Sequence, residues 1–482
     1  MWSDALLNHT KLVFLMFLMS ITTMFQLGYV ASYPNTAFLV FRAFFNESFH
    51  DRGEQLTESG FSWLWAVVLN VWFAGFFCGT WLSPTVSNRL GRKAGLIMGN
   101  SIDMLGTGIT FAAIYLNVPE AMSIGRFAVG IGDGLAANCL TLFLQESAPT
   151  RIRGFLSSFQ ELSVAFSTLA GTVFGLPYVL GSNLLWLVGV AVVPNALLIF
   201  TMKFCPDTPK YLLLGEQNEQ KAIASLHFYH GGEHDVKASL EGIALERDEG
   251  KTTFRDVWRS SYLRKAMMLG CAAFALQVLT GIYPTTLYST VFFRRAGTSE
   301  FGAELGAIGM MICNCVATAL SMNFMDRFGR RAILLGCGSL NVLALLSYTT
   351  FSALSDFTSW AKYGCLGSMF AFSFTFSLGV GPVPWFLTAE LVPHRQRSFI
   401  QSIGYSTNTL FALMTGLLTL PLYDLISAYS FIPLFIVPSL LCLAYLYREL
   451  PETKNREIHE IVDQLRGSAS VLERLQEKEF GL

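Results

Sequence analysis

Two short stretches of the sequence carry the same charged residues at the same spacing. In residues 146–153 and 390–397, a Glu is followed by Pro at the third, Arg at the fifth and Arg at the seventh position. Each stretch ends a long apolar segment. Carboxylates and guanidinium groups placed there can form ion pairs of about 0–1 kcal/mol each. Such weak pairs can break and form again, so their chemistry suits a reversible latch.

Three further ionisable residues lie inside apolar segments. Side chains of this kind are costly in a membrane, are usually paired and usually have a function. Asp133 follows Arg126 by seven residues, two helical turns along one face, so we expect the two to pair or to line a watery surface. We expect Glu161 to face a cavity, where its carboxyl group could hydrogen-bond a solute or carry a proton.

Pro382 and Pro384 interrupt a third apolar segment just before Trp385. Each proline lacks an N–H donor and clashes with the preceding helical turn, so the pair predicts a helix break. Broken backbone at membrane depth is tolerated where protein or a water-filled cavity takes up the freed groups. The pattern therefore predicts a cavity beside Trp385.

The elements that must position these residues are apolar helices. The chain has 482 residues, of which 52% are hydrophobic and 14% charged, against about 25% charged in soluble proteins. A membrane span needs about 20 mostly apolar residues. The predicted spans are Leu12–Tyr33, Phe61–Leu82, Ala94–Leu116, Ala121–Gln145, Leu156–Leu180, Leu184–Met202, Ala266–Phe292, Leu305–Phe324, Ala332–Leu354, Tyr363–Leu387, Phe399–Tyr423 and Phe431–Tyr447.

Three motifs recur in one order at nearly one offset, which indicates a duplicated chain. Glu146 and Glu390 are 244 residues apart, and Arg89 and Arg327, which open two similar basic motifs, are 238 apart. The motifs Pro-Asp-Thr at 206–208 and Pro-Glu-Thr at 451–453 are 245 apart. Two homologous halves in a membrane protein are typical of transporters. We expect an all-α membrane protein with twelve transmembrane helices in two pseudo-symmetric six-helix bundles.

The distribution of Lys and Arg predicts the orientation. With both termini on one side, that side holds 27 of the 33 basic residues, so the termini are expected in the cytosol. Asn46 then lies outside in an Asn-Glu-Ser glycosylation pattern, whereas Asn8 lies in the cytosol. The expected domains are 1–202, an N-terminal bundle; 203–265, a cytosolic helical linker; 266–450, a C-terminal bundle; and 451–482, a cytosolic tail.

Composition also argues against several function classes. The net charge of −1 gives no reason to expect nucleic-acid binding. The sequence shows no nucleophile–base constellation, no cofactor motif and no metal-ligand set, so we expect neither an enzyme nor a cofactor. The nine cysteines lie within or at the ends of apolar runs, which predicts no structural disulfide.

Motifs along nearly the whole chain resemble the sugar porters of the major facilitator superfamily, especially the animal facilitative glucose transporters. The stretches that carry the resemblance are 89–93, 125–127, 146–154, 206–210, 326–331, 381–386 and 451–454. The resemblance implies alternating access to a solute near the middle of the bilayer. It also implies a substrate cavity lined by amides and a Trp, since amides both donate to and accept from hydroxyl groups. The positions expected to bind the solute are Gln277, Asn314, Trp385, Glu161, Asn408 and Asn35.

The cavity residues depart from the family pattern at several positions. The stretch 277–283 keeps its first Gln, but the second Gln is Val278 and the Asn is Tyr283. A usual carboxylate is Ser377, and the Gln usual on span five is Glu161. An Asp that proton-coupled relatives carry after Gly28-Tyr29 is Val30 here. The missing Asp favours facilitated diffusion over proton coupling.

The charged span ends are expected to form a cytosolic gate between the halves. The alternative explanation is that these positive charges only fix the orientation of the spans in the membrane. The duplicated Glu–Arg spacing favours the gate. Its expected members are Arg92, Glu146, Arg153, Arg330, Arg331, Glu390 and Arg397.

Together these patterns predict a multi-pass carrier, expected in the plasma membrane, for a hexose or a similar polyhydroxylated solute. Three alternatives stay open: a non-transporting sugar sensor, a carrier of another solute such as a polyol or a urate-like anion, and a proton-coupled symporter that uses Glu161. The expected partners are the solute and the lipid bilayer.

Overall fold

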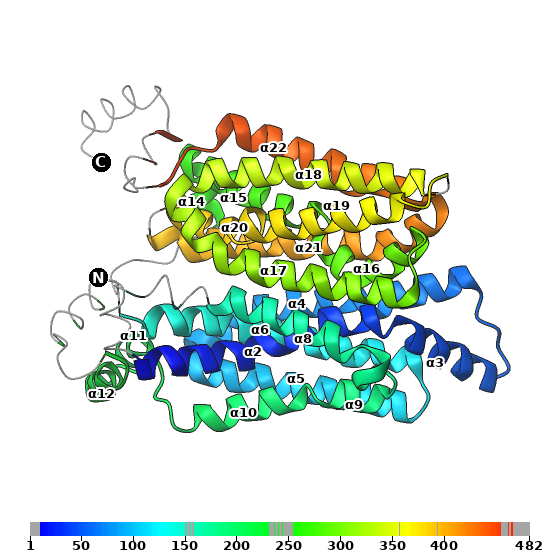
Figure 1. The fold of residues 1–482 in the computed structure, drawn as a ribbon. Coiled ribbons are helices and arrows are strands. Elements are labelled where there is room, and N and C mark those ends of the chain that lie inside the picture. The colour runs from blue at the N-terminus through cyan, green and yellow to red at the C-terminus, as the bar shows by residue number, and fades with distance from the viewer. Residues whose placement is uncertain are drawn as a thin grey trace. The chain divides into compact units, whose positions relative to one another are not determined.

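The computed structural model describes residues 10–149, 152, 156, 159–230, 236, 240, 243, 254–355, 357–392, 394–454, 461 and 464–465. Every regular element in this part of the chain is a helix (Figure 1). The all-α fold predicted from the apolar runs is therefore confirmed.

The helices of the first half match the predicted spans closely. In chain order they are α2 (Thr10–Thr36), α3 (Phe38–Asp51), α4 (Glu58–Leu90), α5 (Arg92–Tyr115), α6 (Met122–Ser147), α8 (Phe159–Phe174), α9 (Leu184–Gly189) and α10 (Val192–Met202).

Short helices link the two halves, as predicted for the polar segment. They are α11 (Pro209–Leu214), α12 (Glu219–His230) and α14 (Phe254–Arg259). The helices of the second half are α15 (Ser261–Leu279), α16 (Ile282–Arg295), α17 (Glu300–Phe328), α18 (Arg330–Leu354), α19 (Ala361–Thr375), α20 (Val383–Leu391), α21 (His394–Ile426) and α22 (Val437–Glu449).

Eleven helical stretches in the described residues are long and apolar enough to cross a membrane. They correspond to eleven of the twelve predicted spans. At the twelfth position, predicted at Leu156–Leu180, the structure has α8, with 16 residues, followed by a five-residue π-helical turn at Pro177–Gly181. The helices thus agree with a twelve-span membrane protein.

The chain forms two compact units that do not coincide with the sequence halves. The first comprises 1–249 together with Tyr283–Cys315 and Ala412–Ser427. The second comprises Gly250–Ile282, Val316–Phe411 and Ala428–Leu482. The first unit therefore contains α16 and the ends of α17 and α21 in addition to the whole first half. The division into two six-helix bundles at 1–202 and 266–450 stays a prediction.

Small residues let helices of the first unit approach closely. A Cβ atom added at Gly75 of α4 would lie 2.1 Å from the carbonyl oxygen of Phe127 in α6, and one at Gly130 of α6 would lie 2.2 Å from that of Trp72. Backbones this close leave no room for a side chain, so glycine is required at the crossing. Gly75 and Gly130 are thus packing residues.

Two spans of the second half are broken. Span seven divides between α15 and α16 at Gly281, whose φ of +88° favours glycine. Span ten passes from α19 through a π-helical stretch, Phe376–Val380, to α20, with Pro382 as the N-cap residue of α20. Pro384 follows in the first turn of α20, where a missing N–H donor costs little. The two prolines thus follow a non-α stretch, and Trp385 lies in the first turn of the helix beyond it.

Candidate solute site and charged network

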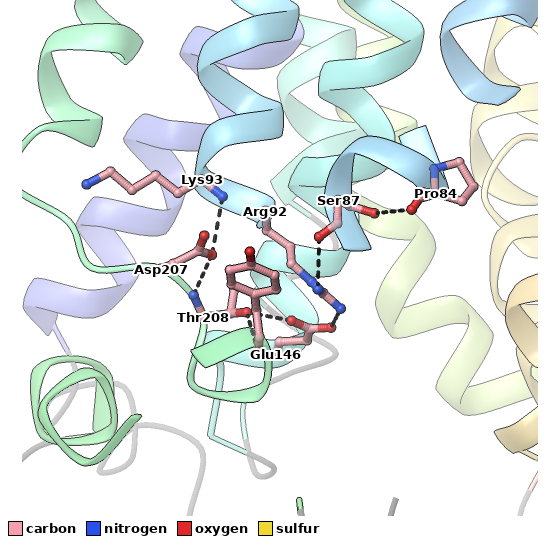
Figure 2. Close-up of polar contacts among 8 residues, drawn as sticks. Pro84, Ser87, Arg92, Lys93, Glu146, Asp207 and Thr208 are labelled. Carbon is pink, nitrogen blue, oxygen red and sulfur yellow. Dashed lines mark hydrogen bonds and ion pairs between the residues drawn. The ribbon is translucent and has the colours of Figure 1, made fainter. Parts of the chain in front are cut away.

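A network of one ion pair and several hydrogen bonds joins the ends of α5, α6 and α11 in the first unit (Figure 2). The guanidinium of Arg92 donates to the carboxylate of Glu146 over 2.8 Å and to the carbonyl oxygen of Ser87 over 3.2 Å. The hydroxyl of Thr208 donates to the other oxygen of Glu146 over 2.6 Å. The two charged side chains are only 11% and 8% exposed, so solvent screens the pair weakly.

The same network fixes the turn between α4 and α5. Asp207 accepts hydrogen bonds from the backbone N–H groups of Lys93 and Thr208, over 3.2 and 2.7 Å. Gly91 has a φ of +93°, and a Cβ atom there would lie 2.1 Å from the Asp207 carboxylate. Burial raises the pKa of the Asp207 carboxyl group, while these N–H donors act to lower it. The carboxylate is thus held against the backbone of the turn.

The second unit repeats this network residue by residue. Arg330 donates to Glu390 over 3.2 Å and to the carbonyl oxygen of Met325 over 3.3 Å, and the hydroxyl of Thr453 donates to Glu390. Glu452 accepts from the backbone N–H groups of Arg330 and Arg331 over 2.9 and 3.2 Å. The Arg–Glu pair, the bond from the Arg to a carbonyl oxygen five residues earlier and the Thr–Glu bond have counterparts at the offsets seen in the sequence. The bond from the N–H of Arg330 to Glu452 has no counterpart among the described residues of the first unit. The duplication read from the motifs is therefore also a duplication of most of these contacts.

The predicted gate residues fall into three groups. Arg92, Glu146, Arg330 and Glu390 form the two networks just described. The guanidinium of Arg331 instead donates to the carbonyl oxygen of Tyr447 over 2.7 Å. Arg153 and the side chain of Arg397 lie outside the described residues. All contacts described for this set lie within one unit, so a gate between the halves stays a prediction.

Amides and aromatic rings gather beside the broken span ten in the second unit. The side-chain amide of Gln277 donates to the carbonyl oxygen of Gly381 and accepts from Asn408 over 2.7 Å. The ring of Trp385 packs against those of Phe274 and Tyr405, with centroids 4.9 and 4.4 Å apart. The indole Nε1 is buried and has no hydrogen-bond partner in the described part of the chain. The neighbouring amides keep donors and acceptors that the described residues do not use. Together with the indole N–H they can bind a hydroxyl group.

The remaining predicted solute residues lie in the first unit. Glu161 and Asn314 are half-buried, and neither has a hydrogen-bond partner among the described residues. Asn35 is buried and bound by the protein: its amide donates to Ser289 over 2.6 Å and accepts from the backbone N–H of Thr290 over 3.0 Å. In this conformation Asn35 thus ties α2 to α16.

Arg126 and Asp133 do not form a direct ion pair in the structure. The guanidinium of Arg126 donates to the hydroxyl of Tyr33 and to the carbonyl oxygens of Val30 and Leu69, over 3.3 to 3.5 Å. Asp133 accepts from the indole Nε1 of Trp72 over 2.8 Å. The seven-residue spacing correctly placed both residues on one helix face. It could not predict that the guanidinium of Arg126 would bind carbonyl oxygens on α2 and α4 instead of Asp133.

Several polar residues of these networks were not singled out from the sequence. At the end of the first unit that carries the predicted outside loop, Asp424 accepts hydrogen bonds from Ser62 and Arg295. Together with Arg42 and Glu58, these residues line a cavity of about 600 Å³. Thr208 and Thr453 could have been identified, because both stand in a repeated motif. Asp424 could not, because nothing in its neighbouring sequence marks it.

Apolar spans, broken helices and duplicated charge networks together indicate a membrane transporter. A family model described as "Sugar (and other) transporter" matches residues 15–465, and the chain belongs to that family. The expectation of a transporter rather than an enzyme is confirmed by this membership.

Similar proteins agree with this assignment. The chain is 28% identical over 465 residues to the "Solute carrier family 2, facilitated glucose transporter member 3" of Canis lupus familiaris, covering 94% of this chain and 93% of that protein. It is 29% identical over 455 residues to member 1 of Gallus gallus, covering 92% of each. A structure of the proton:xylose symporter XylE bound to 6-bromo-6-deoxy-D-glucose is 22% identical, with a TM-score of 0.76, and covers 94% of this chain and 99% of that one. This last likeness supports the fold.

Proposed function

We propose that this protein is a facilitative carrier of a hexose or a similar polyhydroxylated solute, and that it works by alternating access in the plasma membrane with both termini in the cytosol. The observation that carries the proposal is the cluster of Gln277, Asn408 and Trp385 beside the broken span ten. The names of the relatives, which are glucose transporters, support the choice of a sugar.

The amide pair supports a neutral, hydroxyl-rich solute. After its bonds to Gly381 and Asn408, the Gln277 amide still has one N–H donor and one acceptor lone pair. A sugar hydroxyl can use both at once, since it donates and accepts. The unpartnered indole N–H of Trp385 supplies a further donor, and its ring gives an apolar face on which a pyranose could stack.

Contacts within the first unit resemble a gate that must open and close during transport. Asn35 on α2 binds Ser289 and Thr290 on α16, and Asn70 on α4 donates to the hydroxyl of Tyr288 over 3.3 Å. These are neutral hydrogen bonds, each contributing about 0.5–1.5 kcal/mol. Bonds of this strength suit a gate, because a few of them can be exchanged for bonds to water within one transport cycle.

Uptake into liposomes tests the proposal. Purified protein in liposomes should take up a labelled hexose from a panel of hexoses, pentoses, polyols and organic anions, and the transported solute should raise the melting temperature. The variant Gln277→Ala should reduce uptake of that solute, whereas Gln464→Ala in the tail should not. Binding of a hexose without uptake would point to a sensor, and uptake of an anion alone would contradict the sugar assignment.

Proton coupling through Glu161 is a second candidate function. The observation in its favour is that this half-buried carboxyl group has no hydrogen-bond partner in the described part of the chain. If Glu161 carries the coupled proton, Glu161→Gln should abolish accumulation of solute against its gradient and flatten the dependence of uptake on external pH. An unchanged pH profile in the variant would leave facilitated diffusion as the mechanism.

A further inference from the structure

Two carboxyl groups meet in the interior of the first unit. Asp103 on α5 is 0% exposed and Asp133 on α6 is 1% exposed. The carboxyl group of Asp103 lies against the backbone next to Asp133, since a Cβ atom added at Gly132 would be 2.0 Å from its Oδ1. The two acids interact electrostatically. Of the two, only Asp133 stands out in the sequence, by its seven-residue spacing from Arg126.

No cation neutralises both acids within the described residues. Asp133 interacts electrostatically with Arg126, whose N–H groups donate to Tyr33 and to backbone carbonyl oxygens. The phenols of Tyr33 on α2 and Tyr288 on α16 interact with Arg126, and Tyr29 lies one turn before Tyr33. The other titratable side chains on α2, α4, α5 and α6 are Lys11, Cys78 and Cys139, together with the residues near helix ends, Glu58, Arg89, Arg92, Lys93, Tyr115 and Glu146. Helices α9 and α10 contain no charged residue, and α4 has charges only near its ends.

The hydrogen-bond acceptors around the two acids outnumber the donors. Both oxygens of Asp103 and Oδ1 of Asp133 are buried and receive no hydrogen bond of good geometry in the described part of the chain, although the backbone N–H of Asp133 approaches the Asp103 carboxyl group. The carbonyl oxygens of the Asn100 and Gln26 side chains are also buried and receive no hydrogen bond from the described residues. Asn100 lies one turn from Asp103 on α5, and the Gln26 amide is held on the other side by its bond to Thr107. Buried acceptors without donors are rare in folded proteins, so a donor is needed at this point.

We propose that Asp103 and Asp133 bind one proton between them and that it resides on Asp103, as a neutral carboxylic acid beside an Asp133 carboxylate. Asp133 keeps the charge because it accepts from the indole of Trp72 and faces the positive charge of Arg126. Two carboxylates in a buried, apolar site would repel each other strongly. The neutral acid removes that repulsion and supplies the missing donor.

The pH dependence of thermal stability tests the bound proton without any solute. Raising the pH removes the proton and leaves two charges in the interior, so the melting temperature of the wild type should fall by several degrees as the solution becomes alkaline. Asp103→Asn carries an amide donor in place of the acid and cannot ionise. At neutral pH this variant should have the same melting temperature as the wild type. At alkaline pH its melting temperature should not decrease.

A matched control separates the pair from other buried acids. Glu304 is also buried, at 3% exposed, but it accepts a hydrogen bond from Tyr178 over 2.8 Å, so Glu304→Gln should keep the alkaline fall. Infrared spectra give a second readout if Asp103→Asn does not fold. Wild type should then show the carbonyl stretch of a protonated carboxylic acid that disappears at alkaline pH.

Three results would overturn the proposal. One is an identical alkaline profile for wild type and Asp103→Asn. Another is the lack of a protonated-acid band at neutral pH. The third is a melting temperature that rises with Na⁺ but not with choline in wild type alone, because a metal cation would then occupy the place assigned to the proton.

Discussion

Trp385 presents a free donor next to two aromatic rings, and this makes it the most direct test of the solute site. Trp385→Phe removes the indole N–H but keeps an aromatic ring against Phe274 and Tyr405. Loss of one neutral hydrogen bond to the solute costs about 0.5–1.5 kcal/mol. We therefore expect solute affinity about two- to tenfold weaker, measured by the concentration dependence of uptake.

Trp360→Phe is the matched control for that substitution. Trp360 lies just before α19 in the same unit and is 57% exposed, so its loss should not change affinity. If Trp385→Phe bound the solute as tightly as wild type, Trp385 would be a packing residue and the solute would bind elsewhere.

Residue types at the site could be predicted from the sequence better than their partners. The positions of Gln277, Trp385 and Asn408 follow from the motifs around them. The bond between Gln277 and Asn408 joins residues 131 apart, and the bond from the N–H of Thr290 to Asn35 joins residues 255 apart. No local pattern records such contacts, because they depend on how whole helices pack. Asp103 was missed for the same reason, since its significance comes from Asp133 on another helix.

The positions of the membrane spans could be predicted almost completely, because each apolar run has to cross the bilayer, whereas α3 between the first two spans was not predicted. The ends were less certain: α4 extends to Leu90 and α21 begins at His394, several residues outside the predicted apolar spans. Polar residues can continue a helix beyond the membrane, since its backbone hydrogen bonds do not depend on hydropathy. The break of span ten was visible from its prolines, whereas the break at Gly281 in span seven depends on a single backbone angle.

The turn between α17 and α18 gives a prediction at the scale of these elements. Gly329 has a φ of +92°, and an added Cβ atom would lie 2.7 Å from the Glu452 carboxylate. Gly329→Ala should therefore destabilise the protein by about 1–3 kcal/mol, seen as a lower melting temperature. Gly336→Ala is the control, because nothing lies within 4 Å of its Cβ position in α18 and alanine favours a helix. Equal melting temperatures for the two variants would contradict the strained turn.

Across the whole molecule, the duplicated sequence has become two copies of one charged network. The Arg92–Glu146 pair and the bond from Thr208 to Glu146 correspond to the Arg330–Glu390 pair and the bond from Thr453 to Glu390. The motif offsets predicted this correspondence. They could not predict that α16 and part of α21 would join the first compact unit, because that grouping depends on long-range packing.

The two copies differ in burial, and this should make their stability contributions unequal. The side chains of Arg92 and Glu146 are 11% and 8% exposed, whereas those of Arg330 and Glu390 are 21% and 29% exposed. Glu146→Gln leaves Arg92 unpaired in a dry site, at a cost approaching about 3 kcal/mol. Glu390→Gln should cost about 1 kcal/mol. Each Gln can still accept a hydrogen bond from its threonine, so the difference in melting temperature between the two variants measures the loss of the negative charge. A larger loss of stability in Glu390→Gln than in Glu146→Gln would contradict this prediction.

The predicted orientation of the whole molecule can be tested at Asn46. This residue is exposed on α3, the helix between the first two spans, so a bulky glycan could be attached there without displacing other side chains. If the loop is outside, Asn46→Gln should remove a mass shift that glycosidase treatment also removes. Asn8→Gln should leave it intact, because the basic residues predict a cytosolic N-terminus. A glycan that persists in Asn46→Gln and disappears in Asn8→Gln would invert the topology, and with it the assignment of the charged networks to the cytosolic side.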